Sequence, residues 1–209
     1  QLLGLTSDLK YNLEEEEKQK VLDSLATSTR SLDELLKDLN TILSARSTIS
    51  QRVEEVDLAE IAESVRNSLT LQLKESAAGF SVHIHPAIRS VRSIKSYLQS
   101  IIYNLVSNAI KYRAAGRLPF ITMNVTPEVD SICIEIADNG IGIDMKLHKD
   151  QIFKLYQRFD KSTEGKGLGL YMTKTQVEAL GGKIEIQSEK NTGTKFVIRL
   201  SNLQKTNTP

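Results

Sequence analysis

The sequence predicts an α+β protein in which an N-terminal helical hairpin precedes a domain of alternating helices and strands. Two observations lead to this fold class. Over residues 1–50 the leucines recur at steps of three and four, with no proline and a single glycine, which is the spacing of a helix with one apolar face. Over residues 56–201, segments of helical periodicity alternate with segments of period two, and glycine and proline separate several of them.

The first 50 residues are expected to form a dimerisation hairpin. An acidic break, LEEEEK, separates the end of one helix from the run VLDSLATSTRSLDELLKDLNTIL, which follows the heptad rule. Two helices alone bury little apolar surface, so we expect a second copy to complete a four-helix bundle. An amphipathic helix packed on its own domain is the alternative. The expected seam consists of Leu22, Leu25, Thr29, Leu32, Leu36, Leu39 and Leu43.

The domain that follows is expected to combine three helices with five strands. Residues 51–55 are predicted to be a linker and residues 202–209 a disordered polar tail. Asn-Thr-Gly at 191–193 is a hairpin turn between the last two strands. We expect helices at 58–73, 96–113 and 170–180, and strands at 80–85, 120–125, 131–137, 183–188 and 194–200.

Composition excludes several classes of protein. Lys and Arg number 27 against 26 Asp and Glu, so no electrostatic footprint for nucleic acid or an anionic membrane is present. A single cysteine, Cys133, excludes an intramolecular disulfide and fits a reducing compartment. No run is long and apolar enough to span a bilayer, and the N-terminus lacks the features of a signal peptide. We expect a cytoplasmic location, and because the sequence begins without Met, we expect a fragment of a longer protein, which could itself be membrane-bound.

A polar stripe runs along the predicted helix at 96–113. Asn104, Asn108 and Lys111 are spaced by four and three residues, so they share one helix face beside an apolar one. An amide oxygen is a hard ligand suited to Mg²⁺, and a lysine offers positive charge to phosphate oxygens. The stripe is therefore a candidate site for a metal–phosphate group. A solvated helix face is the alternative.

Two glycine-rich segments follow. In SICIEIADNGIGID, Ile132, Ile134 and Ile136 face one way, and the strand ends at Asp138. Gly140 and Gly142 then allow a close backbone approach to a flat ligand, although Asp-Asn-Gly is also an ordinary turn. In EGKGLGLYMTK, three glycines precede a helix, where free backbone N–H groups and the helix dipole favour an anion. The spacing matches neither a Walker A loop nor a Rossmann fingerprint.

Four motifs in this order carry a family resemblance. NLVSNAIKYR, DNGIGID, IFKLYQRF and GKGLGL resemble the asparagine box, first glycine box, phenylalanine box and second glycine box of sensor histidine kinases. Gly193-Thr194 resembles the family's final Gly-Thr, and the match covers about residues 56–201. The resemblance implies the ATP-binding sandwich shared with Hsp90, gyrase and MutL, a mixed sheet packed on helices. Residues 1–50 resemble the later part of the family's dimerisation hairpin.

The resemblance implies a role for individual residues. Asp138 would receive the adenine amino group, Tyr112 would lie against the base, and Asn108 would bind Mg²⁺. Asn104 and Lys111 would be catalytic, orienting the phosphates and the reacting centre. The implied ATP-binding residues are Asn108, Lys111, Tyr112, Arg113, Asp138, Gly140, Gly142, Phe159, Gly165, Lys166, Gly167, Leu168, Gly169 and Thr194.

The implied reaction moves the γ-phosphoryl group of ATP to a histidine of a homodimeric hairpin and then to an aspartate of a response regulator, as in two-component signal transduction. Positioning and charge neutralisation dominate such chemistry. The sequence departs from the family because no histidine occurs before His83. We expect the acceptor to lie upstream of Gln1, together with a sensor domain.

Other readings remain open. An ATPase of the Hsp90–gyrase–MutL group would carry a glutamate where Asn104 stands, and a non-catalytic nucleotide-binding scaffold would not need an acceptor histidine. His83 and His85 form a possible metal pair on one strand face, but with no third ligand nearby we expect packing or exposure instead. Cys133 is expected to be a small core residue.

Overall fold

The computed structural model describes residues 18–29, 52–157 and 167–201. The chain divides into two compact units, residues 1–48 and 49–209. In the first unit, residues 18–29 are helical, as the seam predicts. This helix carries the first three seam positions, and Leu22 among them is 48% exposed in the single chain. The remaining positions of the expected hairpin and the tail at 202–209 lie outside the described residues.

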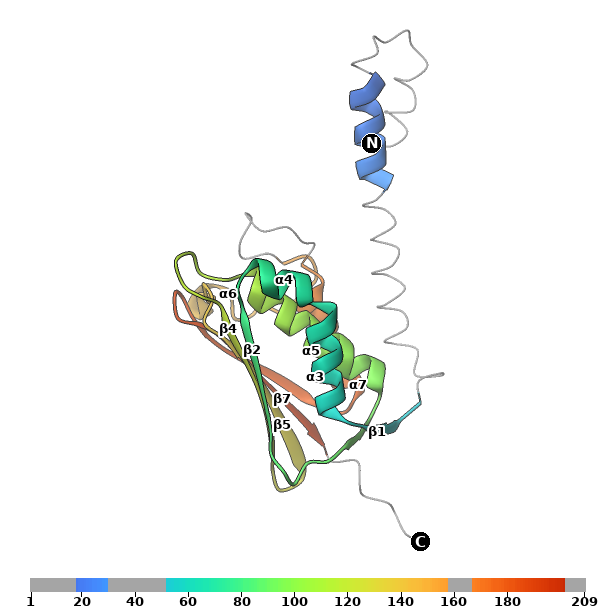
Figure 1. The fold of residues 1–209 in the computed structure, drawn as a ribbon, viewed down its shortest axis with the longest axis vertical. Helices are drawn as coiled ribbons and strands as arrows, with labels where there is room; N and C mark the ends of the chain where they lie inside the picture. Colours follow the sequence, from blue (N-terminus) through green and yellow to red (C-terminus); the bar gives the residue numbers. More distant parts are fainter. Residues whose placement is uncertain (1–17, 30–51, 158–166, 202–209) are drawn as a thin grey trace. The chain divides into compact units, whose positions relative to one another are not determined.

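The second unit alternates helices and strands in the expected manner (Figure 1). Asp57 begins the first of its helices by accepting hydrogen bonds from Ala59 N and Glu60 N. In chain order the elements are β1 (Glu54–Val56), α3 (Leu58–Ser68), α4 (Thr70–Glu75), β2 (Gly79–Ile84), β3 (Val91–Ser93), α5 (Lys95–Lys111), β4 (Phe120–Pro127), β5 (Ser131–Asp138), α6 (Met145–His148), α7 (Gly169–Ala179), β6 (Lys183–Glu189) and β7 (Gly193–Ser201).

Five of the strands form one mixed sheet in the order β2-β4-β5-β7-β6. The pair β2–β4 is parallel, and the three other pairs are antiparallel. β6 and β7 form the hairpin that Asn-Thr-Gly predicts. The short strands β1 and β3 pair with each other as a separate antiparallel ribbon.

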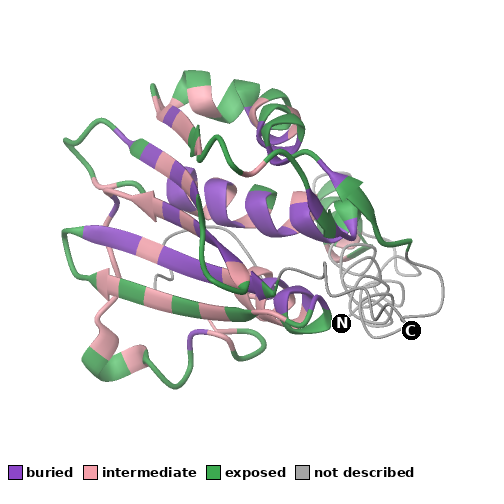
Figure 2. Ribbon diagram, turned by 90° about the horizontal axis from the view of Figure 1, so that it is seen from below, coloured by how far each residue is buried: buried purple, intermediate pink, exposed green. Residues whose placement is uncertain are grey.

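The core lies between this sheet and α5 (Figure 2). Ile101, Leu105 and Ala109 are buried along α5 at steps of four residues, and this period keeps one face of the helix against the sheet. The inward-facing isoleucines of β5 pair in register with apolar residues of β7, Ile134 with Ile198 for example. The polar stripe therefore lies beside the buried face of α5.

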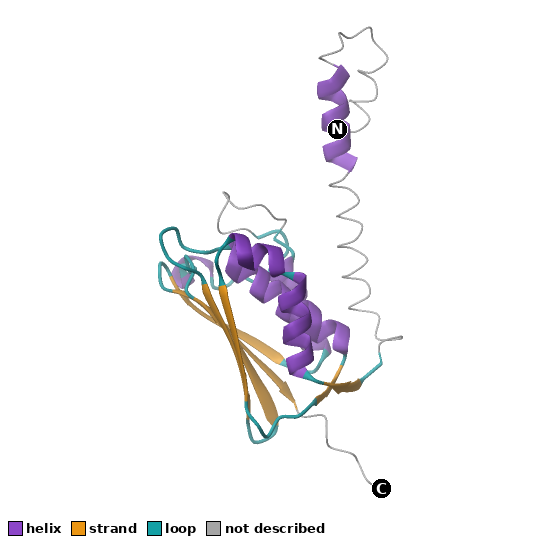
Figure 3. Cartoon of the chain, viewed as in Figure 1, coloured by secondary structure: helices purple, strands orange, loops and turns teal. Residues whose placement is uncertain are grey.

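Helices α3, α5 and α7 cover one face of the sheet, and no described helix covers the other (Figure 3). None of the helices in the described ranges is long and apolar enough to cross a membrane. The sheet thus has one face that forms the core and one that meets solvent, which is the usual arrangement for antiparallel pairs.

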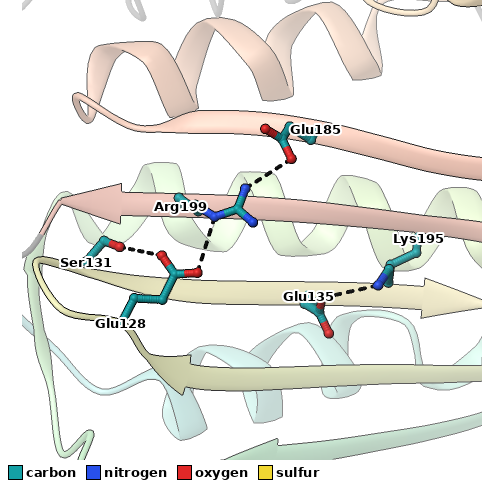
Figure 4. A network of polar contacts seen from close by, with 6 residues as sticks. All are labelled: Glu128, Ser131, Glu135, Glu185, Lys195 and Arg199. Carbon is teal, nitrogen blue, oxygen red and sulfur yellow. Dashed lines mark hydrogen bonds and ion pairs between the residues drawn. The ribbon is translucent and has the colours of Figure 1, made fainter.

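Charged side chains cover the open face (Figure 4). Arg199 on β7 donates to Glu128 at 3.2 Å and to Glu185 on β6 at 3.0 Å, and Lys195 donates to Glu135 at 3.3 Å. Cys133 pairs in register with Arg199 on this face, yet it is buried, and its burial raises the pKa of the thiol. The cysteine is therefore a small packed residue, as expected, but beneath the ionic layer and not against the helices.

The structure differs from the sequence-based expectation at three places. The helix predicted at 58–73 breaks at Leu69, which is buried with non-helical dihedrals (φ −105°, ψ 11°), so α3 and α4 are separate helices. The ribbon β1–β3 was not predicted, because three-residue strands are too short to show a period. Its first strand takes up residues 54 and 55 of the expected linker. The single-turn helix α6 was also not predicted.

Candidate functional site

The alternation of side chains along β5 determines the direction of Asp138. This residue stands two residues after Ile136, so its side chain points to the helix-covered face of the sheet, at the end of the strand. Thr194 on β7 is its partner in register. Asp138 Oδ1 accepts from Gly140 N at 2.8 Å and from Thr194 N at 3.3 Å. Within the described residues nothing donates to Oδ2, so this oxygen remains available for an amine donor.

The carboxyl of Asp138 is under two opposing influences. Burial raises its pKa above the ordinary value of 3.8, and the two backbone N–H donors counteract that rise. Burial is the larger of the two effects. A partly buried carboxylate with one free oxygen is well suited to recognise a ligand N–H group.

The glycine loop after Asp138 packs directly on the end of α5. Ile141 donates its N–H to the carbonyl of Tyr112 at 2.9 Å. A Cβ at Gly140 would overlap this same carbonyl, and a Cβ at Gly142 would overlap the carbonyl of Glu189. These glycines are therefore required by contacts between backbone segments of the protein itself. The sequence had suggested close approach to a ligand as their purpose.

Arg117 ties the loop to the β6–β7 hairpin. Its guanidinium donates to the carbonyls of Asn139 and Asn191, both at 2.8 Å. The Asn139 side chain bonds both Leu118 O and Phe120 N at the start of β4. Three segments that surround Asp138 are thereby fixed to one another. Ser188 adds a further tie, because its hydroxyl accepts from Ile143 N at 2.8 Å.

The polar stripe on α5 is the second part of the candidate site. Asn104, Asn108, Lys111 and Tyr112 are all half-buried, whereas Arg113 is exposed. Lys111 Nζ lies 5.0 Å from the centroid of the Tyr112 ring, a cation–π contact worth about 0.5–1 kcal/mol at such a site. Arg113 donates to the carbonyl of Ile110 at 3.3 Å near the helix end. Lys111 can exchange its weak contact for phosphate oxygens without disturbing the fold.

The start of α7 is the third part of the candidate site. Gly167 has a left-handed conformation (φ +71°), and a side chain there would overlap the backbone of Gln157. Leu168 is buried, and Gly169 lies against the carboxamide of Asn104. Asn104 Nδ2 donates to Thr173 Oγ1 at 2.7 Å. Phe159, Gly165 and Lys166 lie outside the described residues.

The predicted residues thus come together in two groups. Asp138, Gly140 and Thr194 meet Tyr112, while Asn104 meets Gly169. Sequence reasoning missed Arg117, Ser188 and Thr173. No motif marks these residues, because each acts through a hydrogen bond to a distant segment. The single clue was Thr173 itself, a hydroxyl on the apolar side of a predicted helix.

The pair His83 and His85 is the possible metal site that the sequence suggests. His83 and His85 are exposed, and Ser81 Oγ lies 2.9 Å from His83 Nε2. Across the described ranges, no group of three or more His, Cys, Asp or Glu side chains could hold a metal ion. Of the two expected outcomes for these side chains, packing or exposure, the structure shows exposure.

Comparison with known proteins decides the family. Residues 94–204 match the family described as histidine kinase-, DNA gyrase B-, and HSP90-like ATPase. The chain belongs to this family. The match contains the whole of α5, β4, β5, α7, β6 and β7, the elements that carry the candidate site residues.

Relatives of the chain within this family are named as sensor kinases. Sensor histidine kinase AtsR of Burkholderia thailandensis is 29% identical over 187 residues, which are 87% of this chain and 31% of that protein. Sensor histidine kinase YcbM of Bacillus subtilis is 29% identical over 92% of this chain and 62% of its own length. The chain therefore spans about a third of AtsR and less than two thirds of YcbM.

Solved structures of the family share the fold. Histidine kinase AdeS of Acinetobacter baumannii aligns with a TM-score of 0.72 at 20% identity, over 97% of this chain and 94% of that one. Histidine kinase ThkA in complex with the response regulator protein TrrA aligns with a TM-score of 0.70 at 19% identity, over 98% of this chain and 58% of that one. The predicted mixed sheet packed on helices is confirmed.

Proposed function

We propose that this chain is the dimerisation and ATP-binding core of a sensor histidine kinase. The observation that carries the proposal is Asp138, a partly buried carboxylate with one oxygen bound by two backbone donors and the other unbound within the described residues. That free oxygen would accept the exocyclic amine of adenine. A carboxylate cannot donate to the carbonyl of guanine, so the site would prefer ATP to GTP.

The residues at the end of α5 and the start of α7 fit the rest of the nucleotide. Tyr112 would offer its ring to the base, and Lys111 and Arg113 would meet phosphate oxygens. Gly167, Leu168 and Gly169 at the start of α7 would lie over the phosphates together with the preceding glycine-rich residues, and the positive end of the helix dipole favours negative charge there.

The donor set also fits a magnesium ion carried by the nucleotide. Mg²⁺ usually binds through one or two protein oxygens and keeps waters and substrate phosphates as its other ligands. Asn108 offers an amide oxygen on the half-buried stripe, and it would hold the ion. The ion would neutralise phosphate charge when bound, while Asn104 and Lys111 would orient the reacting group.

The hairpin would provide the dimer and the acceptor. Leu22 is largely exposed in the single chain, which supports a second copy that covers the seam in a four-helix bundle. The acceptor histidine would precede Gln1, and the phosphoryl group would then pass to a response regulator. The complex of ThkA with TrrA supports such a partner. We place this core in the cytoplasm, attached to an upstream sensor domain.

Asn104 argues against the alternative ATPase. An amide cannot remove a proton from water as a carboxylate can, so this helix lacks the base that hydrolysis would require. A non-catalytic scaffold would bind ATP without transferring phosphate, and only an activity measurement separates it from a kinase.

The test is phosphorylation of a longer chain. The protein extended upstream of Gln1 would be incubated with radiolabelled ATP and Mg²⁺, and the label then tested for acid lability. We expect an acid-labile label that a histidine substitution in the extension removes. ATP binding without labelling of the protein would favour the scaffold. Release of labelled phosphate without labelling of the protein would favour the ATPase.

A further inference from the structure

We propose that Thr173 is a positioning residue that fixes the carboxamide of Asn104 for phosphoryl transfer. This inference rests on the proposed function and extends it to a residue outside the family's motif positions. It starts from one contact between two helices. Asn104 lies on α5 and Thr173 lies on α7, 69 residues later in the chain, and Asn104 Nδ2 donates to Thr173 Oγ1 at 2.7 Å.

The hydroxyl of Thr173 has a cost that this contact offsets. Thr173 is fully buried at 0% exposure on a helix that packs against α5. Valine would fill the same volume without a polar atom, and a buried hydroxyl is unfavourable unless it is hydrogen-bonded. Its partner among the described residues is Asn104. The hydrogen bond to Asn104 thus explains the hydroxyl, since packing alone does not require it.

The other end of the carboxamide is confined by packing. Its oxygen lies against Gly169, the first residue of α7, and a Cβ there would overlap the carboxamide. The first N–H groups of a helix have no partner within the helix and carry partial positive charge. With its nitrogen bound to the Thr173 hydroxyl, the carboxamide places its oxygen at the start of α7, where the partial positive charge favours it. Asn104 is therefore confined between two residues one turn apart on α7.

This confinement has a chemical consequence. With one N–H committed to Thr173, Asn104 presents a fixed acceptor oxygen beside the glycine-rich segment. A fixed amide oxygen can hold the N–H of an incoming imidazole, but it lacks the basicity to activate water. Because the orientation is set by the fold, no side-chain ordering is needed when the reactants meet. Thr173 would therefore act on the rate of transfer and not on nucleotide affinity.

The test compares three variants of the histidine-bearing chain. Thr173→Val removes the hydroxyl at nearly constant volume, and Thr173→Ser keeps it. Thr175→Val is the matched control, because the Thr175 hydroxyl on the same helix bonds only the helix's own carbonyl at Tyr171 within the described residues. Three quantities would be measured: the autophosphorylation rate at saturating ATP, the Kd of Mg-ATP by calorimetry, and the side-chain amide resonances of ¹⁵N-asparagine, with the Asn104 pair assigned from Asn104→Ala.

Thr173→Val is expected to slow autophosphorylation on the order of tenfold while the Kd of Mg-ATP changes less than about twofold. The Asn104 amide resonances should shift in this variant. Thr173→Ser and Thr175→Val should resemble the unaltered protein in all three measurements. Unchanged rate and resonances in Thr173→Val would overturn the proposal, as would an equal loss of rate in Thr175→Val.

Failure of the proposed function gives a different pattern. The unaltered protein would then bind no ATP or acquire no label, whatever residue stands at position 173. The amide resonances would still decide whether Thr173 holds Asn104, because they are read without nucleotide. Unshifted resonances in Thr173→Val would reject the contact even in that case.

Discussion

Asp138 is a residue whose charge opposes the stability of the fold. Its pKa is raised by burial, so the folded state disfavours the carboxylate relative to the unfolded chain. The contribution of this group to stability is favourable at low pH and is lost as the pH rises through the raised pKa. At neutral pH the folded protein therefore carries an unfavourable charge, which is consistent with a group kept for binding.

This charge predicts a pH-dependent effect of Asp138→Asn. The amide can still accept from Gly140 N and Thr194 N, and it carries no charge to bury. The gain in free energy of unfolding of the variant over the unaltered protein should therefore be larger at pH 7 than near pH 4. Urea unfolding at both values measures the difference, with Asp130→Asn at an exposed position between β4 and β5 as control. A gain that is largest at the lower pH would contradict the raised pKa.

Asn108 is the residue on which magnesium binding is expected to depend. Asn108→Ala should weaken Mg-ATP binding by at least about tenfold, because a buried or half-buried metal ligand is not replaced by the methyl group. The loss should vanish when both proteins are titrated with ATP in EDTA. Asn124→Ala on the open face of β4 is the matched control. Unchanged affinity of Asn108→Ala in the presence of Mg²⁺ would refute the metal role.

At the scale of elements, Arg117 ties the turn of the β6–β7 hairpin to the glycine loop after Asp138. Arg117→Ala removes donors to Asn139 O and Asn191 O and should lower the free energy of unfolding by only about 1 kcal/mol, since the bonds are solvent-exposed. ATP affinity should fall more than stability suggests, because the glycine loop after Asp138 loses its tie to the turn of the hairpin. Calorimetry and urea unfolding measure the two effects.

The control for this variant is Arg89→Ala, at an exposed position away from the hairpin. It should leave ATP affinity unchanged. If Arg117→Ala also binds ATP as the unaltered protein does, the hairpin holds its position without the guanidinium.

Sequence reasoning recovered the elements that have a strong local period. α5 was predicted to within two residues because its apolar stripe is long, and β5 because its isoleucines alternate. It failed at Leu69, where burial in the core overrides a helical pattern, and at β1 and β3, which have too few residues to show a pattern. The positions of Asn104, Asp138 and Tyr112 along the chain were predictable. Their hydrogen bonds with Thr173, Thr194 and Ile141 were not, because such contacts depend on how distant segments pack.

At the scale of the whole molecule, the hairpin predicts a dimer. Leu22→Asp should convert a dimer into a monomer, because the charge would enter the apolar seam of the bundle. Ser24→Asp is the matched control, since it places the same charge on the exposed side of the same helix. Sedimentation equilibrium distinguishes the two states. A monomeric unaltered protein, or a Leu22→Asp variant that remains dimeric, would contradict the seam.

The packing of the glycines bears on how relatives of this protein should be recognised. Gly140, Gly142 and Gly193 each lie where a side chain would overlap the backbone carbonyl of another segment. Selection for folding alone would therefore retain these glycines in a descendant that no longer bound a nucleotide. The glycine motifs in a sequence consequently indicate that a chain has this fold, and do not by themselves indicate that it binds a nucleotide. Asp138 and Asn108, which the fold does not require, are the residues whose loss would reveal that the ligand has gone.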